Sequence, residues 1–227
     1  MDTMRRQGQF EFRTWGGKRR GAGRKRVAER RQVAHRPRER VNAQHPILVT
    51  TRVMPDVARL RTKVMYEAIQ AALAGATKWM YEPEPVRFVH ASVQGNHLHL
   101  LVEAASNEAL SRAMKGFLLS CAKRLNTIAG RQGSVFADRF HTRTLTTPTA
   151  VRNAIRYTLC NARKHGELSA RVRLDPCSSA FALTDWQTET SIRFADVTMQ
   201  VALPKTWLLR EGWRRAGPLS PWDAPSA

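Results

Sequence analysis

The sequence predicts an α+β fold, in which an antiparallel sheet packs with helices on one face. Short runs rich in β-branched residues alternate along the chain with longer segments of helical spacing, in the order β-α-β-β-α-β-α. The two middle strands are separated by a short polar turn, so they are expected to form an antiparallel hairpin. The chain has 227 residues, of which 42% are hydrophobic, and this is enough to build a core beneath such a sheet.

The first strand and the first helix are expected soon after residue 45. Residues 47–53 place β-branched side chains on one face, as a half-buried strand does. A helix is expected to begin at Pro55-Asp56, because apolar residues recur at helical spacing over residues 57–71.

The remaining elements follow from turn and cap residues. Residues 86–93 and 97–103 are expected to form a hairpin around a turn that contains glycine and asparagine. A helix is expected from a serine cap at residue 106 to the glycine at residue 130. Residues 135–145 indicate a weaker strand, and a threonine followed by proline predicts a last helix over residues 148–165.

Positive charge is the dominant feature of the composition. The chain has 38 Lys and Arg against 18 Asp and Glu, a formal net charge of +20, which favours a polyanionic partner such as nucleic acid. Half of this excess lies in residues 1–44, which we expect to be a flexible arm that contacts DNA phosphates. A solvated tail that only aids solubility is the alternative. The predicted DNA-contacting residues of the arm are Lys18, Arg19, Arg20, Arg24, Lys25 and Arg26.

Three parts of the chain are therefore expected. They are the basic arm (1–44), a folded domain (45–166) and a C-terminal extension (167–227). The extension contains several tryptophans among arginines, and these are expected to pack it onto the domain rather than to stack on bases. The tryptophans in question are Trp186, Trp207, Trp213 and Trp222.

Composition also excludes several classes of protein. No uncharged apolar run approaches 18 residues, so we expect no membrane span. Cys121, Cys160 and Cys177 are too widely spaced for a disulfide framework or a zinc site. No apolar segment follows the arginine pair at residues 5 and 6, so no secretory signal is expected, and we predict a cytoplasmic protein.

A pair of histidines carries the first chemical signal. Side chains alternate along a strand, so His97 and His99 point to one face together while Leu98 and Leu100 point to the core. Two imidazoles placed in this way can share one metal ion. Two exposed strand histidines with no such role are the alternative.

The last predicted helix carries the second signal. Its apolar stripe includes Val151 and Ile155, whereas Tyr157 lies off that stripe. Asn161 follows one turn later on the same face as the tyrosine. A tyrosine with an amide neighbour can serve as a nucleophile beside a metal ligand.

These motifs together resemble the single-tyrosine transposases of the IS200 type, and in particular their REP-associated branch. Residues 94–101 (QGNHLHLL) resemble the strand of that family that carries His-hydrophobic-His, the HUH motif. Residues 157–166 resemble the family's helix, in which asparagine follows tyrosine by four positions, although the family's usual next proline is Ala162 here. Residues 134–141 and 175–179 are similar to the segments before and after that helix.

The resemblance implies a ferredoxin-like or RRM-like HUH domain that cleaves and rejoins single-stranded DNA. Tyr157 would be the nucleophile, forming a 5′-phosphotyrosine, and His97, His99 and Asn161 would hold Mg²⁺ or Mn²⁺. The implied partner is single-stranded or hairpin DNA, and the family acts either as a homodimer or as a monomer. The implied activity is DNA transposition and recombination in a bacterial cytoplasm, near the nucleoid. Arg139, His141 and Arg143 alternate just before the tyrosine helix, and this pattern predicts contacts to DNA phosphates or bases, with a solvated basic strand as the alternative.

Other functions fit the sequence less well. A hydrolase of the histidine-triad type would need a third alternating histidine, where the chain has Leu101. A two-histidine phosphoesterase would need a Thr or Ser two residues after each histidine, which neither His97 nor His99 has. The alternative that stays open is a catalytically inactive or domesticated DNA-binding protein of the same fold.

Overall fold

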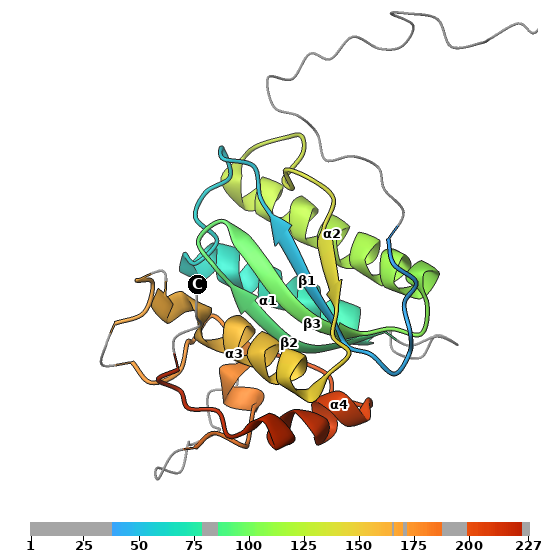
Figure 1. Cartoon of the computed structure of the whole chain (residues 1–227). Coiled ribbons are helices and arrows are strands. Elements are labelled where there is room, and N and C mark those ends of the chain that lie inside the picture. The colour runs from blue at the N-terminus through green and yellow to red at the C-terminus, as the bar shows by residue number, and fades with distance from the viewer. Residues whose placement is uncertain (1–37, 79–85, 165, 170–171, 188–198, 224–227) are drawn as a thin grey trace, which may run out of the picture. The chain divides into compact units, whose positions relative to one another are not determined.

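The structure is a computed structural model of the whole chain, and it describes residues 38–78, 86–164, 166–169, 172–187 and 199–223. The strands and long helices follow in the predicted order, and short helical turns come after them. These elements are β1 (Ile47–Arg52), α1 (Lys63–Lys78), β2 (Arg87–Val93), β3 (His97–Glu103), α2 (Asn107–Ala129), β4 (His141–Thr144) and α3 (Pro148–Lys164) (Figure 1).

The strands form one four-stranded sheet in the order β2-β3-β1-β4, and each neighbouring pair is antiparallel. This confirms the predicted α+β class and the antiparallel sheet. The register brings one residue from each strand into a row across the sheet. Ser92 of β2 lies opposite His99 of β3, which lies opposite Thr50 of β1, and Thr50 lies opposite His141 of β4.

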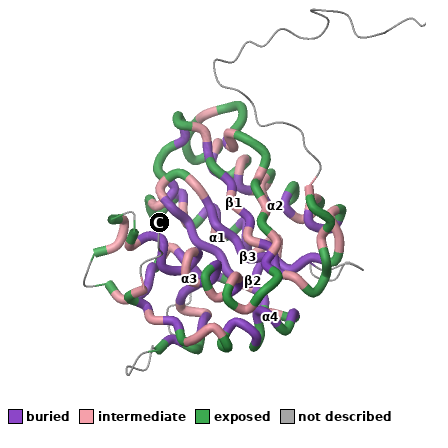
Figure 2. Tube along the Cα trace, viewed as in Figure 1, coloured by how far each residue is buried: buried purple, intermediate pink, exposed green. Residues whose placement is uncertain are grey.

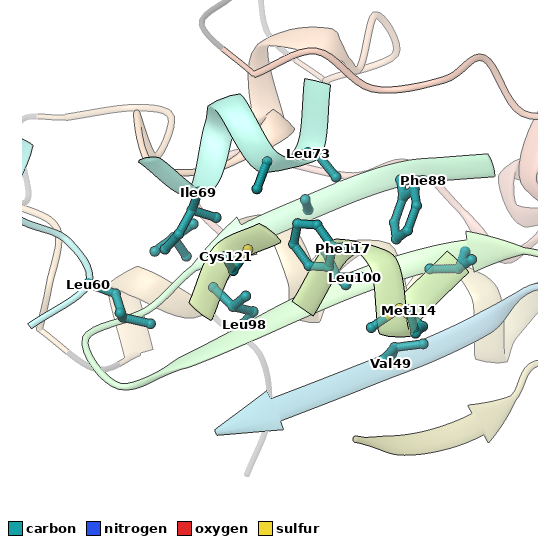
Figure 3. Close-up of a cluster of buried hydrophobic side chains, with 14 of the residues drawn as sticks. Val49, Leu60, Ile69, Leu73, Phe88, Leu98, Leu100, Met114, Phe117 and Cys121 are labelled. Carbon is teal, nitrogen blue, oxygen red and sulfur yellow. The ribbon is translucent and has the colours of Figure 1, made fainter. Parts of the chain in front are cut away.

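One face of the sheet packs against α1 and α2. Val49, Leu98 and Leu100 project from the strands into a cluster with Ile69 of α1 and Phe117 of α2, and all five are at most 2% exposed (Figure 3). Along β1, β2 and β3 most of the residues are buried (Figure 2). Burying apolar side chains at about 25 cal/mol per Å² makes this cluster a main source of stability.

The opposite face is covered by α3, and here the prediction of helices on one face was wrong (Figure 1). Alternation along β3 places Leu101 on this second face, and an irregularity in β2 between Phe88 and His90 places Val89 there too. Val151 and Ile155 of α3 pack on them, and neither helix residue is exposed to solvent. The apolar stripe of α3 was correctly predicted. Which face of the sheet this stripe packs on is shown only by the register of the strands.

The first helix begins later than predicted. It starts at Lys63 rather than near Pro55, because the preceding backbone makes other hydrogen bonds. The amide of Val57 donates to the carbonyl of Met54 at 3.0 Å, and the amide of Leu60 donates at 2.9 Å to the carbonyl of Gly95 in the β2–β3 turn. The segment before α1 therefore holds the hairpin that carries the histidine pair.

The other two long helices have the predicted ends. Ser106 accepts a hydrogen bond from the amide of Ala109 at the start of α2, and Gly130 ends that helix in the left-handed region with φ of 59°. Thr147 accepts from the amide of Ala150 at the start of α3, at 3.2 Å. Among the described residues, no helix has the length and apolar character needed to span a membrane.

The C-terminal segment (residues 199–223) packs along α3 and against the end of β3. The buried carboxylate of Glu103 accepts from the amides of Lys205 and Thr206, at 2.8–3.1 Å, just before the short helix α4 (Trp207–Arg210). Trp186 and Trp213 are 6% and 2% exposed, as expected of tryptophans that pack the extension. Trp207 and Trp222 are about half exposed and lie beneath the guanidinium groups of Arg215 and Arg163.

His90 is a buried histidine whose protonation opposes folding. Its Nδ1 lies 3.3 Å from the hydroxyl of Ser179, and that hydroxyl accepts from the amide of Ala91. Burial lowers the pKa of His90 from 6.5 to about 4. Between pH 6.5 and about 4, His90 is protonated in the unfolded chain but neutral in the native state. The free energy of unfolding is therefore highest above pH 6.5 and falls as the pH drops toward 4.

We expect His90→Asn, which keeps an acceptor for Ser179, to reduce the acid sensitivity of the fold. Between about pH 7.5 and about pH 4 the wild type should lose about 3 kcal/mol more unfolding free energy than the variant. Urea unfolding at the two pH values measures this difference. The exposed His141→Asn is the control and should behave as the wild type, whereas equal pH dependence of wild type and His90→Asn would contradict the assignment.

Candidate active site

His97 and His99 lie side by side on the face of the sheet that α3 covers. Their ring centroids are 4.6 Å apart, and the rings are nearly perpendicular. The Nδ1 of His97 lies 2.8 Å from Oδ1 of Asn96. Because an amide oxygen can only accept, Nδ1 of His97 carries the proton and its Nε2 keeps a lone pair.

The tautomer of His99 is fixed by two neighbours. The amide nitrogen of Asn161 lies 3.2 Å from Nε2 of His99, and since that nitrogen can only donate, Nε2 is an acceptor. In the neutral ring the proton is then on Nδ1, which donates to Oγ1 of Thr50 at 3.1 Å. Nε2 is therefore the unprotonated nitrogen of both imidazoles, the form in which imidazole binds a metal ion, and in this structure the Nε2 lone pair of His99 accepts the hydrogen bond from Asn161.

Helix α3 brings the tyrosine and the asparagine to the same place. The ring centroid of Tyr157 lies 4.7 Å from that of His99, in an edge-to-face arrangement. Asn161, one helical turn further on, is fully buried, while Tyr157 is half-buried. The structure thus brings together the residues predicted to be catalytic and metal-binding, from β3 and α3.

The Asn161 side chain also leaves a buried acceptor without a partner. Its amide nitrogen donates to His99, but its Oδ1 is buried and accepts no hydrogen bond from the part of the chain that the structure describes. A buried polar atom left unsatisfied costs about 1–3 kcal/mol. A divalent cation beside the imidazole Nε2 atoms would remove that cost, so the residues present fit a cation with nitrogen and oxygen ligands. No cluster of three His, Cys, Asp or Glu suited to a metal is found among the described residues.

The basic residues expected to contact DNA divide into two groups. Arg139, His141 and Arg143 are exposed at and just before the edge strand β4. His141 and Arg143 project to the face that α3 covers, since they lie opposite Thr50 and Leu48 of β1. The arm residues Lys18, Arg19, Arg20, Arg24, Lys25 and Arg26 lie outside the described residues.

A pocket of about 400 Å³ opens beside Tyr157, between α3 and the strands β1 and β4. It is lined by both cationic and apolar side chains, so it suits a phosphate with its attached nucleoside. The lining residues are Leu48, Thr50, Arg143, Ala150, Asn153, Ala154, Arg156 and Tyr157.

The end of the predicted arm contacts the domain. The amide of Val41 donates to Oδ1 of Asn107 at 3.0 Å, and Arg38 donates to the carbonyl of Phe140 while its guanidinium lies 3.8 Å from that ring's centroid. The boundary of the arm at residue 44 stays a prediction.

A buried ion pair holds the segment that follows α3 against the hairpin. Arg61 donates to both carboxylate oxygens of Asp175, at 2.7 and 3.0 Å, and to the carbonyl of Val93 at 2.8 Å. Burial alone would lower the pKa of Arg61, but its bonds and charge interactions with Asp175 raise it. Breaking one partner of such a pair leaves an uncompensated buried charge, which is strongly destabilising.

Cys160 is excluded as a rival nucleophile, although it is three residues from Tyr157. Burial, together with the charge of Asp223, raises the pKa of its thiol to about 12, so the thiolate is absent at neutral pH.

Thr50 and Asn96, which orient the imidazoles, were missed by the sequence analysis. Asn96 directly precedes His97, and this adjacency was a usable signal. Thr50 is placed opposite His99 only by the pairing of β1 with β3, and no local pattern shows that pairing.

The comparisons with known proteins find distant likeness of fold. No family model and no curated protein sequence matches the chain. The structure is similar to that of a REP-associated tyrosine transposase bound to a REP hairpin, with 15% identity and a TM-score of 0.46, over 60% of this chain and 76% of that one. It is also similar to a candidate transposase of Deinococcus radiodurans R1, with 12% identity and a TM-score of 0.37, over 62% of this chain and 100% of that one.

Replacing Thr50 with valine should weaken metal binding without touching a proposed ligand. The change removes the acceptor of the His99 Nδ1 proton, and losing such an outer partner typically lowers metal affinity by about 10- to 100-fold. Isothermal titration with Mn²⁺ measures the affinity, and long-range ¹H–¹⁵N spectra report the tautomer of His99.

The matched control is Thr51→Val, one residue further along β1. The hydroxyl of Thr51 is buried and has no hydrogen-bond partner, and it lies on the other face of the sheet. This variant should bind Mn²⁺ as the wild type does. Equal affinities for Thr50→Val and wild type would show that Thr50 does not orient His99.

Proposed function

We propose that the protein is a metal-dependent nuclease and strand transferase for single-stranded DNA, of the kind that single-tyrosine transposases represent. The observation that carries this proposal is the convergence of four residues at the interface of β3 and α3. Tyr157 lies against the ring of His99, the rings of His97 and His99 lie side by side, and the Asn161 amide contacts Nε2 of His99 while its own buried oxygen lacks a donor among the described residues.

The proposed cation ligands are Nε2 of His97, Nε2 of His99 and Oδ1 of Asn161. A cation bound there would take the place of the Asn161 N–H at Nε2 of His99, and the Asn161 amide would turn its oxygen toward the cation. A bound Mg²⁺ or Mn²⁺ would polarise the scissile phosphate and offset charge on the transferring phosphoryl group. A tyrosine phenol is a weak nucleophile at neutral pH, with an ordinary pKa of about 10, and it needs such help.

Tyr157 then performs the covalent step. Its phenolic oxygen attacks the phosphorus, a new bond forms between that oxygen and phosphorus, and the bond from phosphorus to the 3′ oxygen breaks. The phenol loses its proton to solvent, and the departing 3′ oxygen takes one up. The fragment on the 3′ side of the break stays linked to Tyr157 through its 5′-phosphate, so a second 3′-hydroxyl can reverse the reaction without a nucleotide cofactor.

Charge on the domain supports a single-stranded DNA substrate. Arg143 lines the pocket beside Tyr157, and Arg139 and His141 are exposed at and just before the same edge strand, so in this proposal they contact DNA phosphates. The basic arm adds further phosphate contacts in this proposal. The same basic edge would also serve a protein that binds DNA without cleaving it, and covalent attachment separates the two functions.

Tyr157→Phe should abolish covalent attachment and cleavage while leaving DNA binding nearly intact. Phenylalanine keeps the ring that packs on His99 and removes only the attacking oxygen. The probe is a pool of 3′-labelled hairpin oligonucleotides with randomised single-stranded flanks, incubated with Mn²⁺ and resolved on a denaturing gel. The wild type should give a labelled protein band, because the protein retains the 3′ fragment.

Tyr66→Phe is the matched control for that experiment. Tyr66 lies in α1 and donates to the carbonyl of Pro176 at 2.8 Å, away from the histidine pair. Its variant should form the adduct at the wild-type rate. A labelled band of wild-type intensity from Tyr157→Phe would assign the nucleophile to another residue.

A further inference from the structure

Gln94 contains a second buried amide oxygen without a hydrogen-bond partner. The side chain is 1% exposed, and its amide nitrogen donates to the hydroxyl of Ser92 at 2.6 Å. Its Oε1 is buried and accepts no hydrogen bond from the described residues. A glutamine that only filled space could be replaced by methionine at no loss of packing, and the unsatisfied oxygen would then be avoided.

The sheet register places Gln94 beside the histidine pair. The backbone amide of Gln94 donates to the backbone carbonyl of His97 at 2.9 Å, so the two residues are opposite one another across the hairpin. Ser92, which receives the Gln94 side chain, lies opposite His99. Because side chains alternate along a strand, Ser92 and Gln94 project to the same face as the imidazoles.

The backbone around Gln94 is held firmly from several directions. Arg61 donates to the carbonyl of Val93 at 2.8 Å, and Leu60 donates to the carbonyl of Gly95 at 2.9 Å. Gly95 itself is closely covered, since a Cβ at that position would lie 2.9 Å from Oε1 of Glu167. A donor on such a fixed turn is preorganised, as a metal ligand must be.

We infer that Oε1 of Gln94 is a fourth protein ligand of the cation. Unlike Asn161, which lies in α3, Gln94 directly follows β2, in the hairpin of the sheet. This inference rests on the proposed function, because it assigns a further ligand to the same site. Two imidazoles alone favour softer metals such as Zn²⁺, whereas amide oxygens favour Mg²⁺ and Mn²⁺. A second amide oxygen would therefore shift the preference of the site toward the hard cations that phosphoryl transfer requires.

The experiment measures Mn²⁺ and Zn²⁺ affinity of the full chain without DNA, by isothermal titration, together with the melting temperature of the metal-free protein. Gln94→Met should weaken Mn²⁺ binding about tenfold and Zn²⁺ binding less. The metal-free melting temperature should stay equal or rise, because the unsatisfied oxygen is gone. Gln94→Glu should bind Mn²⁺ at least as tightly as the wild type.

A matched control is available on the other side of the sheet. Gln70 in α1 also has a buried amide atom without a partner, and Gln70→Met should change neither affinity. Equal Mn²⁺ affinity of Gln94→Met and wild type would overturn the inference, and so would an equal loss of Mn²⁺ and Zn²⁺ affinity with a lower melting temperature.

His97→Ala separates failure of this inference from failure of the proposed function. If His97→Ala loses Mn²⁺ while Gln94→Met does not, the histidine site stands and only the role of Gln94 fails. If the wild type itself binds no Mn²⁺, both are overturned.

Discussion

The contact between Asn161 of α3 and His99 of β3, a hydrogen bond in this structure that a cation would replace, is the interaction on which the proposed site depends. It is a polar contact at 3.2 Å within an interface that Val151, Ile155 and Leu101 make otherwise apolar. Apolar packing supplies the larger part of the binding energy between α3 and the sheet, since a net hydrogen bond contributes only about 1 kcal/mol. Apolar packing alone, however, would allow α3 to shift along its axis relative to the sheet. The contact between the Asn161 amide and the His99 imidazole fixes one position of the helix along that axis. In that position the ring of Tyr157 contacts the ring of His99.

The C-terminal segment fixes the same helix from its outer side. Arg152 donates to the carbonyls of Gly217 and Pro218, and the guanidinium of Arg163 lies 4.7 Å from the ring centroid of Trp222. Helix α3 is thus held between the sheet and this segment along most of its length. A nucleophile on a helix supported in this way is better placed for in-line attack than one on a loop. The extension therefore contributes to the site although none of its residues is a proposed ligand.

Local patterns were sufficient to predict the strands, the ends of α2 and α3, and the shared face of His97 and His99. Each of these depends on alternation, helical spacing or a cap within a few residues. The face on which α3 packs could not be predicted, because it depends on Leu101 and Val89 from different strands. The late start of α1 and the role of Thr50 were missed for the same reason, since Leu60 bonds to Gly95 and Thr50 bonds to His99 across the fold. Contacts between distant segments leave no periodic signal in the sequence.

The central claim is that a cation bound between β3 and α3 activates attack by Tyr157. The most direct test is the Mn²⁺ concentration that gives half-maximal covalent protein–DNA adduct, measured for wild type, Asn161→Ala and Asn161→Asp. Alanine removes the proposed oxygen ligand, so its midpoint should rise about tenfold or more, whereas the carboxylate of aspartate should restore a midpoint near that of the wild type. Equal midpoints for all three proteins would contradict the claim, because Asn161 would then have no part in the cation site.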